Sequence, residues 1–109
     1  MPTVYKTLGQ SAPSATTLTT LYTVPSATSA VVSTITICNQ SSSAATYRIA
    51  VRPAGASVAA QHYIVYGATV AGSDTTALTL GITLATTDVI SVYASTATLS
   101  FSAFGSEIS

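Results

Sequence analysis

Apolar residues alternate with small or polar ones along most of this chain, and clusters of turn residues interrupt the alternation. The interruptions come roughly every ten residues, a spacing typical of all-β sandwiches and barrels. Alternation places one set of side chains on each face of a β-strand, whereas a helix repeats about every 3.6 residues, and no segment shows that helical period. We therefore predict an all-β fold: a single antiparallel β-sandwich of about eight strands, jelly-roll-like or of a similar topology, without substantial helix.

The chain has 109 residues, a usual size for one domain, so we expect residues 1–109 to form a single sandwich. Gly9 and Pro13 interrupt the first alternating run, and one interpretation of residues 1–16 is an extended N-terminal arm. The expected strands are 4–8, 17–24, 30–39, 45–52, 61–66, 78–84, 89–94 and 98–104.

Short connections between these strands predict two antiparallel hairpins. The turn at 25–29 would join the second and third expected strands, and residues 95–97 would join the last two. Pro53 should end the fourth strand, and Gly67 should break or bulge the fifth.

Strict alternation also assigns the faces of the strands. Arg48, Ala50 and Arg52 should point outward, and Cys38 is expected to be a small buried residue. The residues expected to face the core are Val31, Ser33, Ile35, Ile37, Tyr47, Ile49, Val51, Leu78, Leu80, Ile82 and Leu84.

Reactive side chains are scarce in this sequence. No general base or nucleophile accompanies His62 in the sequence, which argues against an enzyme, and a net charge of zero argues against a nucleic-acid partner. No catalytic residue, metal ligand or cofactor site is expected, because Asp74 and Asp88 lie in turns, where Asp bonds the backbone. The charged residues, the one histidine and the one cysteine of the chain are Lys6, Arg48, Arg52, Asp74, Asp88, Glu107, His62 and Cys38.

Uninterrupted apolar runs are short, far below the ~20 residues that span a bilayer, so no membrane partner is expected. The first residues lack an apolar stretch after a basic segment, which argues against a cleaved secretory signal, and we expect the protein to stay in the cytoplasm where it is made. A nearly uncharged surface promotes association, so a homo-oligomer is expected.

Several segments carry a recognisable pattern that spans almost the whole chain: LYTVP at 21–25, AVVSTI at 30–35, RIAVRPAG at 48–55, HYIVY at 62–66, and the stretches 80–95 and 101–108. In these segments the chain resembles small β-rich virion structural proteins of tailed phages, cyanophages among them. The resemblance implies a virion component, made in the host cytoplasm.

Within such phages, similar β-modules serve as capsid cement, neck or tail parts. We expect a cement or decoration protein on the capsid surface, which stabilises the shell by bridging subunits of the major capsid protein. The alternative is a neck, tail or fibre module for assembly or for binding a host glycan or receptor. The chain is short and has no fibrous or coiled-coil segment, which favours the first interpretation.

The candidate site is therefore a protein interface. Arg48 and Arg52 lie four positions apart on one strand, so they should share a face about 13 Å apart. They would either protect the sheet from edge pairing or bind carboxylates of a partner. Tyr22, Tyr63, Tyr66 and Tyr93 could form a platform for a sugar, although on strands tyrosines more often line the core or contact protein. The candidate interface residues are Tyr5, Lys6, Arg48, Arg52, Tyr63, Tyr66 and Glu107.

Overall fold

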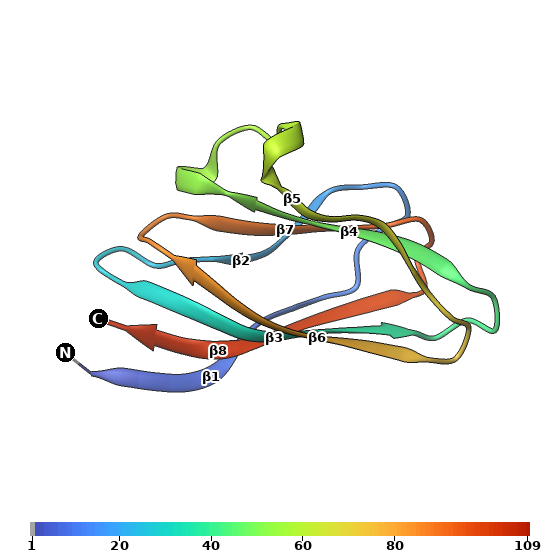
Figure 1. Ribbon diagram of the computed structural model, residues 1–109, viewed down its shortest axis with the longest axis horizontal. Helices are drawn as coiled ribbons and strands as arrows, with labels where there is room; N and C mark the ends of the chain where they lie inside the picture. Colours follow the sequence, from blue (N-terminus) through green and yellow to red (C-terminus); the bar gives the residue numbers. More distant parts are fainter. Residues whose placement is uncertain (1) are drawn as a thin grey trace.

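A computed structural model describes residues 2–109, which form two four-stranded antiparallel sheets stacked face to face (Figure 1). The first sheet has the order β1-β8-β3-β6 and the second has the order β2-β7-β4-β5. Because this part of the chain contains no α-helix, the predicted all-β antiparallel sandwich is confirmed. The strands are β1 (Thr3–Ser11), β2 (Thr19–Thr23), β3 (Ser29–Asn39), β4 (Ala45–Arg52), β5 (Tyr63–Val70), β6 (Thr75–Leu84), β7 (Val89–Ala94) and β8 (Leu99–Ile108), with the short turns η1 (Pro53–Gly55) and η2 (Ala60–His62).

The strands pair in a nested order. β4 pairs with β5, β3 with β6, β2 with β7 and β1 with β8, each antiparallel. Every connection except the one from β4 to β5 therefore crosses from one sheet to the other. The two predicted hairpins, β2 with β3 and β7 with β8, are wrong. A short connection can arch across the gap of about 10 Å between stacked sheets as readily as it can close a hairpin.

The core lies between the two sheets and draws on every strand except the edge strand β1, which contributes a partly buried leucine. At its centre Phe101 of β8 meets Tyr47 of β4 edge to face, with the ring centroids 6.2 Å apart. Ile35, Ile49 and Ile90 are also fully buried. Burial of one such side chain stabilises the fold by about 1.5–3 kcal/mol, so these inner faces hold the sheets together.

The face predicted for β3 is correct over half its length. Ile35 and Ile37 are buried as expected, but Val32 is buried where Val31 and Ser33 were predicted. A bulge between Val32 and Thr34 interrupts the pairing of β3 with both of its neighbours. An extra residue shifts the alternation by one position, and Ser33 is left exposed, donating its hydroxyl to the Phe104 carbonyl (3.1 Å).

The predicted burial of other residues is confirmed on β6 and wrong at Ala50 and Cys38. Leu84 is buried and the three apolar residues before it on β6 pack against the core from an edge strand, where they are only half buried. Ala50 was predicted to point outward and is nevertheless fully buried, because residues 53–62 fold over that part of the sheet (Figure 1). Cys38 was predicted to be buried and is only half buried. It lies beside Ser100 and Thr75, on the side of β3 that faces away from the core.

Most of the segment interpreted as an arm forms β1, which pairs with β8 along its length. A bulge at Leu8 bends β1, and the following Gly9 approaches β2 so closely that a Cβ there would lie 2.1 Å from the Leu21 carbonyl oxygen. Residues 3–11 are therefore fitted to the sandwich by the absence of a side chain at one position.

The loops at one end of the sandwich are tied together by Asn39, which is buried. Its amide donates to the carbonyls of Ser43 (2.8 Å) and Ala71 (3.3 Å), and its oxygen accepts from the Ser41 N–H (3.0 Å) and the Thr98 hydroxyl (3.2 Å). Three connections between the sheets thus share one side chain, which belongs to the last residue of the expected strand 30–39.

Candidate functional site

β5 contains two bulges, and the one at Ile64 places two tyrosines on the outer face of the second sheet. Tyr63 lies opposite Ala50 and Tyr66 lies opposite Arg48, although their spacing would place them on opposite faces of a regular strand. The extra residues are Ile64 and Gly67, and Gly67 adopts a φ of 80° that other residues rarely tolerate. The predicted bulge at Gly67 is confirmed. Because the bulge at Ile64 places Tyr63 and Tyr66 on the same face, their rings touch edge to face, with centroids 4.9 Å apart.

Arg48 completes a cluster with these rings. Its guanidinium carbon lies 4.1 Å from the ring centroid of Tyr66 and 4.3 Å from that of Tyr93, which is the residue opposite Arg48 on β7. We call Arg48, Tyr63, Tyr66 and Tyr93 the Arg48 cluster. Each cation–π contact of this kind is worth about 0.5–1 kcal/mol at an exposed site, so the planar group is held in a defined orientation.

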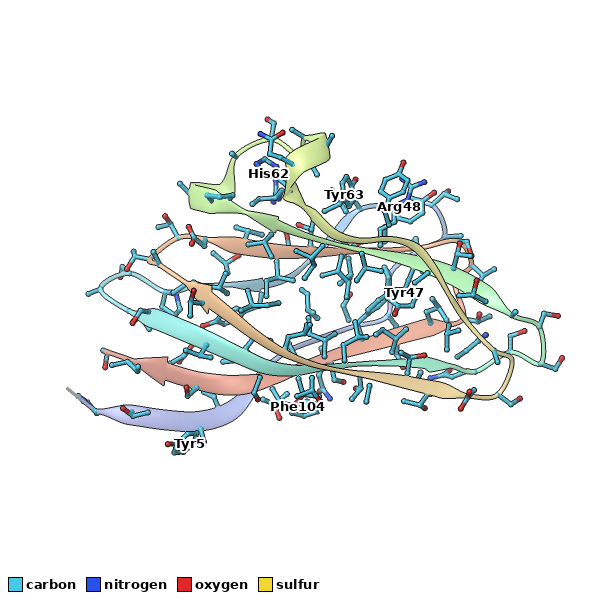
Figure 2. The ribbon with its side chains drawn as sticks, in the orientation of Figure 1. Tyr5, Tyr47, Arg48, His62, Tyr63 and Phe104 are labelled. Atoms are coloured by element: carbon cyan, nitrogen blue, oxygen red, sulfur yellow. The ribbon has the colours of Figure 1, made fainter. Side chains whose placement is uncertain are left out.

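The Arg48 guanidinium has no carboxylate partner within residues 2–109, and none of its N–H groups donates a hydrogen bond there. Tyr66 is 64% exposed, so the cluster opens to solvent. Figure 2 shows Arg48 and Tyr63 projecting outward from the same side of the molecule. The cluster therefore offers flat aromatic surface next to unused, fixed hydrogen-bond donors, a combination that suits a carboxylate or a hydroxyl-rich ligand.

Arg52 does not share this arrangement, although it lies on the same strand face as Arg48. Its Nε donates to Ser91 Oγ and its Nη1 donates to the Ala56 carbonyl, both at 3.2 Å. Asp88 accepts from the Ala54 N–H on the same segment (2.8 Å). Arg52 thus fastens the segment 53–62 over the sheet, and the predicted pair of equivalent anchors separates into one free arginine and one structural arginine.

Asp74 and Asp88 have the local roles predicted for them, and His62 also bonds the backbone close by. Asp74 accepts from the Thr75 N–H (2.8 Å), and Asp88 also accepts from the Ala85 N–H (2.9 Å), so both carboxylates bond the backbone of turns. His62 is half buried just before β5, and its Nδ1 accepts from the Ala59 N–H (3.0 Å).

Lys6 and Glu107 meet each other instead of projecting outward. Lys6 Nζ donates to Glu107 Oε1 (3.1 Å), and the Tyr22 hydroxyl donates to Glu107 Oε2 (2.5 Å). The hydrogen bond from Tyr22 and the charge of Lys6 together lower the pKa of Glu107, against an opposing effect of burial. Burial and the neighbouring carboxylate raise the pKa of Tyr22. Because Tyr22 belongs to one sheet and Glu107 to the other, we call these three residues the inter-sheet latch.

Tyr5 lies on a different surface from the Arg48 cluster. It is 84% exposed, and Figure 2 shows it with Phe104 on the side of the first sheet that faces away from the second. Their strand partners on that side, Thr7, Thr34 and Ser106, are uncharged. The seven candidate residues therefore divide among three places: the Arg48 cluster with Arg52, the inter-sheet latch, and this outer face.

The comparisons give no relative. No family model, curated protein or solved structure matches this chain. Within residues 2–109 there is no pocket, and no three His, Cys, Asp or Glu side chains lie together in a way that could hold a metal ion. No helix in the described part of the chain has the length and hydropathy to cross a membrane. The candidate site is thus a projecting surface.

Sequence reasoning missed Phe104, and it named Tyr93 only as one of four tyrosines that could form a platform. Tyr93 is in the predicted strand 89–94, but its place beside Arg48 depends on the pairing of β4 with β7. Phe104 lies at the point where both neighbours of β8 carry a bulge. The alternation of residues within a single strand indicates neither the pairing of β4 with β7 nor the bulges beside β8. Both could be predicted only from the register of each strand with its neighbours.

Proposed function

We propose that this protein is a non-enzymatic virion structural protein of a tailed phage, a capsid cement or decoration protein that binds across subunits of the major capsid protein. The observation that carries the proposal is the Arg48 cluster. A guanidinium held between two tyrosine rings, without a carboxylate of its own, is suited to a carboxylate on a partner surface.

The composition of the cluster supports contact with protein. Tyrosine and arginine are enriched among the residues that dominate binding energy in protein interfaces. Tyr66 is largely exposed and Tyr63 is half buried, so a partner would remove apolar ring surface from water around the arginine. The rings are already positioned by their mutual contacts, which reduces the entropy lost on binding.

The architecture adds a second line of support. We infer that the nested pairing of eight strands, divided as β1-β8-β3-β6 and β2-β7-β4-β5, is a jelly roll. This architecture is used by viral capsid proteins and by lectins. Lys6 and Glu107 bond each other, and Arg52 and Asp88 bond neutral groups of the same chain. A sandwich with so few free charges suits a part that is installed on a protein shell.

The first test is the copy number of the protein in purified virions of the phage that encodes it. Heads and tails are separated and the protein is counted by quantitative mass spectrometry. The proposal expects hundreds of copies in the head fraction. A few copies in the tail fraction would instead support a place in the neck, tail or fibre. Absence of the protein from both fractions would contradict the proposal that it is a virion component.

The second test addresses the site. Arg48→Gln should weaken binding to capsids that lack the protein by about tenfold or more, because one partner of a charged hydrogen-bonded pair is removed. Arg48→Lys keeps the charge but loses the planar fork, so it should also bind more weakly. Tyr5→Ser, on the opposite face, is the matched control for an exposed position. Equal loss with Tyr5→Ser would contradict the assignment of this site.

A second candidate function rests on the same rings. Exposed tyrosines beside free donors can stack on a sugar and bond its hydroxyls, which favours a host-glycan-binding module of the neck, tail or fibre. Binding to a glycan array that is abolished by Tyr66→Ala, together with low copy number in tails, would support this function over capsid decoration.

A further inference from the structure

The sandwich has four edge strands, and they differ in how they are protected. β1 and β6 flank the first sheet, and β2 and β5 flank the second. A free edge presents unpaired backbone N–H and C=O groups to any other strand. Proteins that must not pair at an edge shorten it, bulge it, or place a charge or proline on it.

Three of the edges carry such devices. β1 carries a charge, Lys6, and a bulge at Leu8. β2 has only five residues and is followed closely by Pro25. β5 carries two bulges, at Ile64 and Gly67. Each of these strands is a poor template for a further strand.

β6 is different. It runs for ten residues, TTALTLGITL, with no charge and no proline, and β3 is its single hydrogen-bonded neighbour. It has one bulge, where Leu80 and Gly81 lie opposite Ser33 of β3, but the alternation of exposed and half-buried residues continues through it. On its inner side Leu78, Leu80 and Ile82 remain half exposed. A long, uncharged edge strand with exposed apolar side chains is the kind of edge that binds another strand.

Gly81 lies at the bulge of the same strand. Its φ does not lie in the left-handed region, and a Cβ built on it would meet nothing within 4 Å. A glycine inside a strand often marks a bulge or a place where another backbone approaches closely, and the open space beside Gly81 leaves room for such an approach.

We propose that β6 pairs antiparallel with β6 of a second copy of this chain, across a two-fold axis, so that the first sheet continues from one copy into the other. A self-pairing edge must avoid like charges opposite each other, and β6 has none. Its alternating threonines also form favourable cross-strand pairs with one another. This proposal does not depend on the proposed function.

The available area is consistent with a stable dimer. Ten residues extend about 33 Å at ~3.3 Å per residue. Figure 1 is viewed down the shortest axis, and the two sheets are stacked in the plane of the picture, where the molecule extends 27 Å. This side of the sandwich, which carries both β6 and β5, therefore offers roughly 900 Å² per copy, or about 1,800 Å² in total, within the range of specific interfaces.

The experiment is sedimentation equilibrium of the purified full chain, combined with amide hydrogen exchange. The wild-type protein should be a dimer, and β6 amides should become less protected as dilution dissociates it. Thr79→Lys, an exposed position on β6, should raise the dimer dissociation constant at least about tenfold, because a two-fold axis places both new charges in the interface. Thr20→Lys, an exposed threonine on the edge strand β2 at the opposite side of the sandwich, is the matched control and should leave the dimer intact.

Gly81→Thr provides a second variant in case Thr79→Lys fails to fold. It should keep or raise the melting temperature of the monomer and still weaken the dimer, because the new side chain has space within one copy only. A wild-type monomer at high concentration, or a dimer that survives both β6 variants, would overturn the proposal. Protection of β6 that appears only on addition of capsids would also overturn it, in favour of a strand donated by the capsid protein.

Discussion

Tyr22→Phe removes a single hydroxyl from the inter-sheet latch and is the sharpest test of what holds the two sheets together at this edge. Tyr22 is 6% exposed, and its hydroxyl donates to the Glu107 carboxylate. A hydrogen bond to a charged group contributes about 1.5–3 kcal/mol to stability. Phe fills the same space, so we expect the free energy of unfolding to fall by about 2 kcal/mol from this hydrogen bond.

Lys6 bonds the same carboxylate and should matter less. Its side chain is 46% exposed, and exposed ion pairs are usually worth about 0–1 kcal/mol. Lys6→Met should therefore lower the free energy of unfolding by less than about 1 kcal/mol. We therefore expect Tyr22→Phe to lower the free energy of unfolding more than Lys6→Met does, because burial and not formal charge decides the size of the loss.

The latch should also depend on pH at both ends of the scale. The pKa of Glu107 is lowered in the folded protein, so its contribution is complete above the ordinary value of 4.5 and is lost as the pH falls through the folded value. The pKa of Tyr22 is raised, so its contribution is complete below 10.0 and is lost as the pH rises beyond it.

Urea denaturation of the wild type and of both variants measures these effects, at neutral pH and in acid. The cost of Tyr22→Phe should shrink as the pH falls below 4.5, because protonation of Glu107 removes the charged acceptor. A cost of Tyr22→Phe within about 0.5 kcal/mol of zero, or a larger cost for Lys6→Met, would refute the reasoning.

Three further predictions concern the core, a loop contact and the Arg48 cluster. Phe101→Ala should lower the free energy of unfolding by about 3–5 kcal/mol in urea titrations, because it empties the centre of the core. Gly72→Ala should lower the melting temperature, since a Cβ there would lie 2.1 Å from the Ser42 carbonyl oxygen, whereas Gly81→Ala should not lower it. Arg48→Gln should cost at most about 2 kcal/mol in calorimetry, the sum of two cation–π contacts, so any larger loss would mean that this arginine is structural.

The strands themselves could be predicted from local pattern, and their partners could not. The bounds of β4 and β7 coincide with the predicted 45–52 and 89–94, because alternation and Pro53 are local signals. Which strand lies beside which is decided by the burial of all inner faces at once. That is why two sequential pairs were assigned to hairpins although their connections arch between sheets.

Bulges limited the prediction of faces. The bulge at Gly67 could be predicted because glycine readily adopts a positive φ. The residue type of Ser33 gives no comparable indication of a bulge. One undetected extra residue reversed the predicted inner and outer sides of β3 in the part of the strand before it. For the same reason the contact of Tyr63 with Tyr66 could not be expected from their spacing.

The candidate site was predictable in its residue types and not in its pairing. Arg48, Tyr63 and Tyr66 were all named from the sequence, and the structure brings them together. Lys6 and Glu107 were named as surface contacts, but they engage each other across almost the whole length of the chain. Isolated charges in a sequence give no indication of a partner so remote.

The nested pairing also has a kinetic consequence. β4 and β5 close the shortest loop, and each further pair, β3 with β6, β2 with β7 and β1 with β8, encloses all those within it. Such a chain has a high contact order, which slows folding, and the entropy of loop closure favours assembly from the innermost pair outward. β1 pairs with β8 alone, so during synthesis on the ribosome β1 stays unpaired until β8 has emerged.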